Sequence, residues 1–198
     1  WQTQCYNCPR LKKDLKSYTF DFSRKMFRDK KKYFSKIKNL AVICVSDWLK
    51  NEVEKSFLKN ARVIDRIYNW VDTNVFKPVD ASDIIKKYNL EHKFIILGIA
   101  AYWGENKGVG DFNKLAEMIP DDFQIVLVGK LCRDITLHPK ILLIESTTDV
   151  LLLNKYFSMA NVFLNLSYEE TFGKVTIEAM ACGTPTIVYN TTACPELV

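Results

Sequence analysis

The sequence predicts an α/β fold built on a parallel β-sheet. Short apolar segments alternate with segments of helical pattern through most of the chain, which is typical of successive β–α–β units. Segments such as Phe94–Ala100 and Phe123–Val128 are nearly all apolar, as strands buried on both faces of a sheet are. With 198 residues, the chain is long enough for one good-sized domain and part of another.

The first part of the chain predicts the end of a separate domain. Its expected elements are the strand Leu40–Val45, the helix Trp48–Leu58 and the strand Arg62–Tyr68. Ser46 precedes the helix and suits its N-cap. Asn69–Pro78 is rich in turn-forming residues and is the best candidate for a linker. We therefore expect two domains, residues 1–76 and residues 77–198, each of them cut short.

The second part predicts a nearly regular alternation of helices and strands. Helices are expected at Ala81–Tyr88, in the segment before Pro120, at Asp149–Met159 and within Glu170–Cys182, and strands at Phe94–Ala100, Phe123–Val128, Ile141–Ile144, Asn161–Leu166 and Thr184–Tyr189. Parallel sheets bind their ligands beyond the carboxyl ends of the strands. The loops expected at those ends are Ser46, Tyr102–Gly108, Gly129–Lys130, Glu145–Ser146 and Ser167–Gly173.

Composition and charge exclude several classes of protein. Apolar residues make up 48% of the chain and charged residues 26%, as in soluble globular proteins, and no apolar run approaches the roughly 20 residues that span a bilayer. The net charge is +5, but residues 24–38 alone carry +7, which leaves −2 for the rest. Because the excess is confined to one segment, nucleic acid is not an expected partner.

The basic segment, residues 24–38, has two interpretations. It is either a solvated helix face or a surface that contacts anionic lipid or a lipid-linked acceptor, where each basic residue adds about 1 kcal/mol. Aromatic residues interleaved with the bases suit an amphipathic helix as well as a membrane-edge contact; they are Phe20, Phe22, Phe27, Tyr33 and Phe34.

The cysteines indicate a compartment and raise the question of a metal. Six are scattered along the chain without a secretory signal, which favours the cytoplasm. Cys5 and Cys8 have the two-residue gap of a zinc knuckle, but a structural zinc site needs four ligands. No second pair lies at a suitable spacing, so the partners precede Trp1 or no metal is bound.

The two glutamates Glu170 and Glu178 flank a turn that contains Gly173. If the intervening residues were helical, eight steps would place both carboxylates on the same side, about 12 Å apart along the axis. Two acids so placed would contact opposite ends of one elongated ligand, and the helix start between them would offer N–H groups to an anion. The alternative is a pair of solvated glutamates, one of them favoured by the helix dipole.

The surrounding motif resembles a known family. Ser167-x-x-Glu170-x-Phe172-Gly173, followed by Glu178 and then by Ala-Met-Ala-Cys-Gly-Thr-Pro, is similar to retaining GT-B glycosyltransferases of family 4, the group 1 glycosyl transferases. Three upstream matches occur in the correct order: Val45–Trp48, the linker Tyr68–Pro78 and Asn106–Gly108. The resemblance covers roughly residues 40–198 and implies a Rossmann-like nucleotide-sugar-binding domain preceded by the end of an acceptor-side domain.

The resemblance implies a role for each matching residue. Glu178 would accept hydrogen bonds from the ribose hydroxyls of a nucleotide sugar, and Glu170 would contact the transferred sugar. The backbone of Phe172, Gly173 and Lys174 would approach the sugar and the diphosphate, where a side chain on the glycine would leave no room.

The remaining implied contacts concern the diphosphate and the base. Lys107 would neutralise the diphosphate as it leaves, although an ordinary surface lysine is the alternative. The Gly129–Lys130 turn and the backbone around Glu145 would lie near the nucleotide, with the base held by backbone groups. No obligatory metal or other cofactor is implied.

The chain departs from the family pattern at three places. The loop before Lys107 lacks the arginine that often accompanies it, so Lys130 or Lys174 would have to supply the second cation. Trp70 stands in the linker where the family has glycine. Thr191 and Thr192 stand where the family tends to have glycines.

The expected function is transfer of a sugar, with retention of configuration, from a nucleotide-diphosphate sugar to a glycan or a lipid-linked acceptor. Such an enzyme would serve polysaccharide biosynthesis at the inner face of the membrane. Two alternatives remain: a GT-B-like nucleotide-sugar epimerase, and a nucleotide-sugar-binding module without catalysis, because most of the acceptor-side domain is missing. A dehydrogenase and a serine hydrolase are not expected, since neither Gly-x-Gly-x-x-Gly nor Gly-x-Ser-x-Gly is present.

Overall fold

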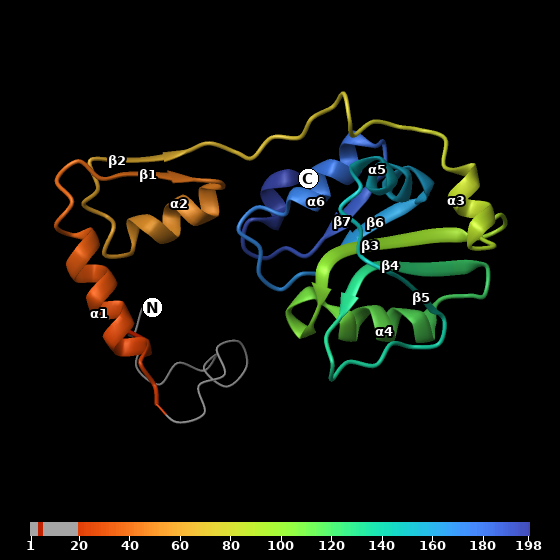
Figure 1. Cartoon of the computed structure of the whole chain (residues 1–198), viewed down its shortest axis with the longest axis horizontal. Helices are drawn as coiled ribbons and strands as arrows, with labels where there is room; N and C mark the ends of the chain where they lie inside the picture. The colour runs from red at the N-terminus through yellow and green to blue at the C-terminus, as the bar shows by residue number, and fades with distance from the viewer. Residues whose placement is uncertain (1–3, 6–19) are drawn as a thin grey trace. The chain divides into compact units, whose positions relative to one another are not determined.

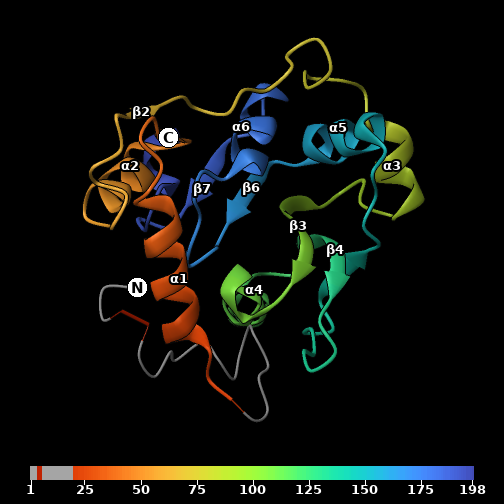
Figure 2. The same ribbon diagram turned by 60° about the vertical axis from the view of Figure 1, so that its left-hand side comes forward.

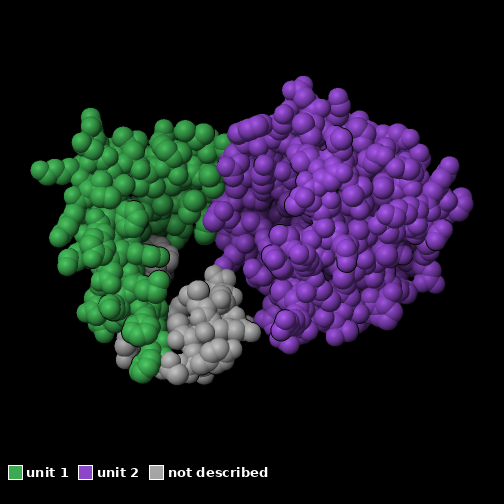
Figure 3. All heavy atoms as spheres, viewed as in Figure 1, with its two compact units in different colours: residues 1–68 green, residues 69–198 purple. Residues whose placement is uncertain are grey.

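The computed structural model describes residues 4–5 and 20–198 (Figure 1). It divides into two compact units, Trp1–Tyr68 and Asn69–Val198 (Figure 3). This division falls before the boundary between residues 76 and 77 that the sequence suggested. The reason is that the end of the turn-rich stretch packs on the second unit: Phe76 is buried with its ring edge-on to Phe157 at 6.1 Å, and the Lys77 N–H donates to Asn154 Oδ1 at 3.2 Å.

In its described residues, the first unit contains two helices and a short parallel ribbon. Its elements are α1 (Ser23–Phe34), β1 (Ala41–Cys44), α2 (Asp47–Glu54) and β2 (Val63–Arg66). β1 and β2 pair in parallel, and Ser46 caps α2 as expected, since its Oγ accepts from the Leu49 N–H at 3.1 Å. Within the described residues, no helix of either unit is long and apolar enough to cross a membrane.

The second unit is the parallel α/β domain that the sequence predicts. Its elements are α3 (Ser82–Lys87), β3 (Phe94–Trp103), the 3₁₀ turn η1 (Glu105–Lys107), α4 (Val109–Met118), β4 (Phe123–Leu131), β5 (Ile141–Ile144), α5 (Val150–Met159), β6 (Val162–Asn165), α6 (Lys174–Ala181), β7 (Thr186–Val188) and the 3₁₀ turn η2 (Cys194–Leu197). All five strands are parallel, in the order β5-β4-β3-β6-β7. The predicted fold class is therefore confirmed.

The central strands are apolar because both faces of the sheet are covered. The helices α3, α5 and α6 lie on one face of the sheet and α4 lies on the other (Figure 2). Ile95 and Leu97 pack in the first of these layers, whereas Ile96, between them, packs in the layer of α4. The same alternation occurs in β4, where Val126 faces one layer and Leu127 the other. Each fully buried side chain of this size contributes roughly 1.5–3 kcal/mol, so the two layers hold the sheet from both sides.

β3 runs further than the sequence predicts. The loop was expected to begin at Ala101, but the strand continues to Trp103, with a register shift between Ile99 and Tyr102. The shift turns Trp103 into the α4 layer, where only 2% of it is exposed and its Nε1–H donates to the Val128 carbonyl at 3.1 Å. The end of β3 is thereby fixed to β4.

Gly129 has a packing role beneath this bulge. Its φ is +146°, and a Cβ would lie 2.0 Å from the Ala100 carbonyl oxygen and 2.8 Å from Trp103 Nε1. Neither backbone carbonyl nor buried indole can move aside, so the position requires glycine. This packing is sufficient to explain why a glycine occupies position 129, which the sequence had led us to expect near the nucleotide.

The order of the strands decides where a ligand can bind. From β3 the chain proceeds outward to β4 and β5, and then crosses to the other side of β3 to form β6 and β7. The connections therefore leave β3 and β6 in opposite directions, and a crevice opens beyond their carboxyl ends. The site is built at this switch point.

We expect Gly129→Ala to destabilise the second unit by about 3 kcal/mol. The new methyl group would clash with a backbone carbonyl, and alanine would be strained at this positive φ. The matched control is Gly110→Ala, since Gly110 lies exposed in α4 and a Cβ there would have no heavy atom within 4 Å; this change should stabilise by about 0.5–1 kcal/mol. Urea unfolding of both variants measures the difference. Equal stability of the two variants would contradict the packing role.

Candidate functional site

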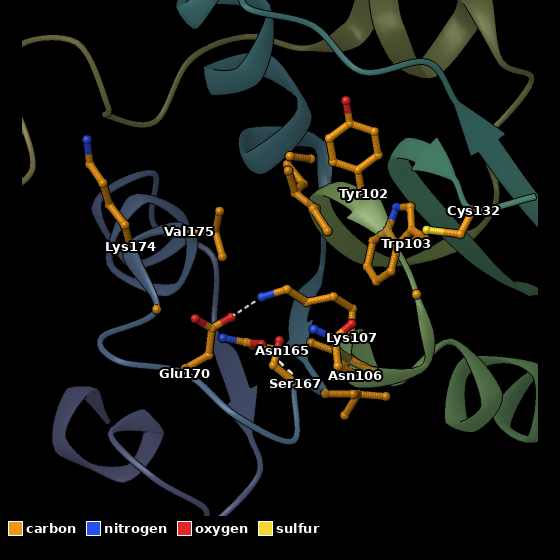
Figure 4. A pocket seen from close by; sticks show the side chains of 17 residues that line it. Tyr102, Trp103, Asn106, Lys107, Cys132, Asn165, Ser167, Glu170, Lys174 and Val175 are labelled. Carbon is orange, nitrogen blue, oxygen red and sulfur yellow. Dashed lines mark hydrogen bonds and ion pairs between the residues drawn. The ribbon is translucent and has the colours of Figure 1, made fainter. Parts of the chain in front are cut away.

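A pocket of about 440 Å³ lies at the carboxyl ends of β3 and β6 (Figure 4). This volume is within the range of small-molecule sites, roughly 300–1,000 Å³. Three segments supply most of its lining: the end of β3 with η1, the end of β6, and the turn into α6. The polar and aromatic residues among them are Tyr102, Trp103, Asn106, Lys107, Asn165, Ser167, Glu170 and Lys174.

The structure brings Lys107 and Glu170 together. Lys107 extends from η1 toward Glu170, which lies in the loop after β6, and its ammonium forms an ion pair with Glu170 Oε1 (Figure 4). The side chains are 28% and 17% exposed, respectively, so solvent screens this pair less than one at the surface. An anion that enters the pocket would therefore meet a cation whose charge is already balanced by a carboxylate.

The start of α6 forms another wall of the pocket. Gly173 is its N-cap and has a left-handed backbone, with φ +90° and ψ +53°. The first N–H groups of a helix have no intrahelical acceptors, and both Gly173 and Lys174 line the pocket. Asn165 fixes this turn to the sheet: its Nδ2 donates to Thr176 Oγ1 at 3.1 Å, and its Oδ1 accepts from the Ser167 N–H at 3.2 Å.

The expected helical relation between Glu170 and Glu178 is wrong. α6 begins at Lys174, because the left-handed conformation of Gly173 prevents the helix from extending back to Glu170. Only the last four steps are helical, and they rise about 6 Å. Glu170 lines the pocket from a loop, while Glu178 lies deeper along α6 and is not part of the lining in this fully described unit.

Glu178 is a buried carboxylate. It is 9% exposed, and burial raises its pKa above the usual range, an effect that the Lys174 ammonium partly opposes. Lys174 Nζ lies 3.7 Å from Glu178 Oε1. Because burying a carboxylate is unfavourable unless the charge is compensated, and because perturbed carboxylates gather at functional sites, Glu178 is a candidate ligand contact next to the pocket.

Other predicted donor contacts lie outside the pocket lining. Phe172 is 4% exposed and contributes its side chain to the interior. Lys130 is exposed and lies opposite Tyr102 in the sheet register. Glu145 is exposed beyond the end of β5. Gly129 is also absent from the lining of this unit, in which every residue is described.

Asn165 and Trp103 line the pocket, although the sequence indicated no role for either of them. Asn165 is a polar residue at the end of an apolar strand, and that position was the available signal. The position of Trp103 could not be predicted, because nothing in the sequence indicates the bulge in β3. Tyr168 and Asp111 are joined by a hydrogen bond of 2.6 Å, a contact that only the folded chain creates.

The structure does not test whether Cys5 and Cys8 bind zinc. Cys8 lies outside the described residues, while Cys5 is half-buried with a free thiol. In residues 4–5 and 20–198, no group of three or more histidine, cysteine or acidic side chains is placed to hold a metal ion.

Together, the fold and the site define a Rossmann-like α/β domain with a ligand crevice at its topological switch point, lined by a lysine, a carboxylate and a helix start. The family model for glycosyl transferases group 1 matches residues 92–198. The chain therefore belongs to the group 1 glycosyltransferase family.

Individual relatives agree with this assignment. N-acetyl-alpha-D-glucosaminyl L-malate synthase of Bacillus anthracis is 28% identical in an alignment 168 residues long, which covers 79% of this chain and 43% of the relative. Sucrose-phosphate synthase from Thermosynechococcus elongatus superposes with a TM-score of 0.70 at 24% identity, covering 92% of this chain and 47% of the other.

HepE of Anabaena, crystallised with UDP-glucose, also has a TM-score of 0.70, at 19% identity, over 86% of this chain and 50% of HepE. At these identities the structural likeness concerns the fold, which is the GT-B type. The chain spans half or less of the length of each of these three relatives.

We expect Glu178→Gln to raise the free energy of unfolding at pH 7 by about 1 kcal/mol, because the buried charge is removed while the shape is kept. The pKa of Glu178 is raised in the folded state, so its ionised form lowers the free energy of unfolding. This loss of stability is complete above the folded-state pKa and disappears as the pH falls below the ordinary glutamate pKa, about 4.

Unfolding measured between pH 7 and pH 4 checks this expectation, with Glu117→Gln, at an exposed position of α4, as the control. A Glu178→Gln variant that is less stable than the parent at pH 7 would show that the carboxylate is a net stabilising group.

Proposed function

We propose that this chain is the donor-binding part of a retaining glycosyltransferase, which moves a sugar from a nucleotide-diphosphate sugar to a glycan or lipid-linked acceptor. The observation that carries the proposal is the meeting of Lys107, Glu170 and the start of α6 around one pocket at the switch point. Two relatives support it: one is named a glucosaminyl malate synthase, and HepE was crystallised with UDP-glucose.

The diphosphate would lie between Lys107 and the first N–H groups of α6. Helix N-termini attract anions through these groups and through the helix dipole, and a lysine ammonium suits a phosphate as a point charge. Lys174, with 60% of its side chain exposed at the start of α6, would supply the second cation in place of the missing arginine. Both cations would stabilise the charge that develops on the leaving diphosphate.

Donor binding would rearrange the Lys107–Glu170 ion pair. As the ammonium turns to the diphosphate, the Glu170 carboxylate would be released to accept hydrogen bonds from hydroxyls of the transferred sugar. The acceptor hydroxyl would then attack from the face that the diphosphate leaves, which retains the configuration. In this scheme the two carboxylates bind the donor and neither acts as a nucleophile.

The nucleoside would extend away from this centre. Glu178 would accept hydrogen bonds from the ribose hydroxyls, and the backbone of Phe172 and Gly173 would approach the sugar and the diphosphate. Gly129, Lys130 and Glu145 lie at the ends of β4 and β5, so these residues would flank the base and its ribose.

The acceptor side would include a contact with anionic membrane at the cytoplasmic face. α1 overlaps most of the +7 segment, and Met26 and Tyr33 of this helix and its N-cap Phe22 are exposed. Cosedimentation with phosphatidylglycerol vesicles should exceed that with phosphatidylcholine vesicles and should fall as salt rises. Equal binding to both kinds of vesicle would contradict the contact.

A second candidate function is donor binding without transfer. The described part of the first unit supplies a sheet of two strands, and the chain covers 43% of the Bacillus anthracis relative. Turnover of donor by a longer chain, with binding alone by these 198 residues, would assign the pocket to binding and the chemistry to the two units together.

A thermal-shift screen of UDP-, GDP-, ADP- and CMP-sugars tests the proposal. A nucleotide sugar present at 100 times its dissociation constant should raise the unfolding free energy by about 2.7 kcal/mol. The absence of stabilisation by every nucleotide sugar at millimolar concentration would overturn the proposed function.

Lys107→Ala should weaken the binding of UDP, or of the nucleoside diphosphate that the screen selects, by about 10-fold, since about 1.4 kcal/mol of charge-assisted binding is lost. Lys155→Ala is the matched control, because Lys155 pairs with Asp83 between α5 and α3, at 2.6 Å, outside the pocket. Calorimetry measures both. Unchanged affinity in the Lys107 variant would remove Lys107 from the phosphate site.

A further inference from the structure

The loop that carries Glu170 is joined to the loop that carries Lys107. The Tyr168 N–H donates to the carbonyl of Asn106 at 3.0 Å, and Asn106 directly precedes Lys107. This backbone hydrogen bond joins two segments that lie far apart in the sequence, and the Lys107–Glu170 ion pair joins the same two segments. The position of Glu170 therefore depends on how firmly Tyr168 is held.

The side chain of Tyr168 is held by a carboxylate of α4. Its hydroxyl donates to Asp111 Oδ2 at 2.6 Å, and the Tyr189 hydroxyl donates to the same oxygen at 2.9 Å. The two tyrosine rings stack with their centroids 6.0 Å apart and an angle of 11° between their planes. One carboxylate thus joins α4, the loop after β6 and the segment after β7.

The protonation states favour these bonds at neutral pH. The hydrogen bond from Tyr168 is the largest of the effects that hold the pKa of Asp111 below its usual range. The same hydrogen bond raises the pKa of Tyr168, and burial first, with the bond to Asp111 second, raises that of Tyr189 to about 12. At pH 7 the carboxylate is therefore charged and both phenols keep their protons.

Two threonines in the segment after β7 also form hydrogen bonds with the loop that carries Glu170. Thr192 Oγ1 accepts from the Glu170 N–H at 2.9 Å, and Thr191 Oγ1 donates to the Tyr168 carbonyl at 3.1 Å. The Ala193 N–H also donates to the Glu170 carbonyl, at 3.3 Å. The backbone groups of Tyr168 and of Glu170 are thus hydrogen-bonded to the segment after β7.

Thr192 adopts a strained backbone to make its contact. Its φ is +49°, a left-handed conformation that is unfavourable for a β-branched residue. A glycine would adopt this conformation freely but would bring no hydroxyl to the Glu170 N–H. Strain of this kind persists where the surrounding structure holds it, often at functional sites.

We propose that Tyr168 and Thr192 are positioning residues for the donor sugar. With Asp111, Tyr189 and Thr191 they form a clamp that fixes the backbone on both sides of Glu170, so that its carboxylate stays directed into the pocket when Lys107 turns to the diphosphate. This inference rests on the proposed function, in which Glu170 contacts the transferred sugar.

The first test needs no ligand. Amide hydrogen exchange of Tyr168 and Glu170, followed by NMR, should become about 5-fold faster in Tyr168→Phe and in Thr192→Gly, because each loses one hydrogen bond of about 1 kcal/mol. Phenylalanine keeps the ring stack, and glycine relieves the strain while removing the hydroxyl. Amides of β4 should exchange at the parent rate in both variants.

Two control variants accompany this test. Thr192→Ser keeps the hydroxyl and should restore slow exchange at Glu170. Lys114→Ala removes an exposed cation that lies 3.4 Å from the other oxygen of Asp111 and should leave the loop unchanged. If exchange at Tyr168 and Glu170 is the same in Tyr168→Phe and Thr192→Gly as in the parent, the clamp is overturned.

The second test measures the contribution of the sugar to binding. The probes are UDP-glucose and UDP, and the readout is the ratio of their affinities in calorimetry. Tyr168→Phe and Thr192→Gly should lower this ratio about 5-fold with UDP affinity kept, whereas Thr192→Ser and Lys114→Ala should keep the parent ratio. A purely structural role would reduce both affinities together.

The outcomes separate this inference from the proposed function. If the parent chain binds neither probe nor any other nucleotide sugar, the proposed function fails, while the exchange experiment still decides whether the clamp exists. If the parent binds UDP-glucose more tightly than UDP and both variants keep that preference, Glu170 is positioned without the clamp and the inference is overturned.

Discussion

The pairing of β3 with both β4 and β6 is the constraint on which the rest of the domain depends. β3 is buried on both faces, and the chain leaves it in one direction toward β5 and returns on its other side as β6. Parallel strands of this order cannot have their connecting helices side by side at the switch point. The crevice therefore follows from connectivity, and the core makes it rigid.

The residues at the crevice are held by contacts that are less favourable than those of the core. Glu178 is a carboxylate in a largely buried place, Thr192 has a left-handed backbone, and Lys107 and Glu170 form an ion pair in the pocket. Each arrangement lowers stability or holds charge in a restricted geometry. The apolar layers on both faces of the sheet provide the stability that these arrangements require.

Two glycines shape the backbone around the pocket, for different reasons. Gly129 lies under the bulge that turns Trp103 inward, where a Cβ would clash, and Gly173 has a left-handed backbone that ends the loop and starts α6. Lys107, Asn165 and Glu170 line the pocket from three segments of the chain. The pocket is thus an outcome of how β3 ends and how α6 begins, and the side chains in it need no long-range rearrangement to meet.

The sequence by itself determined the α/β class, the order of the elements and the motif from Ser167 to Glu178, because burial on both faces makes parallel strands apolar and because helix caps and glycines act locally. It could not determine the bulge in β3, the Lys107–Glu170 pair or the bonds from Asp111 and Thr192 to the Glu170 loop. Those features join residues that are distant in the chain, and only the packing of the sheet and its helices decides which of them meet.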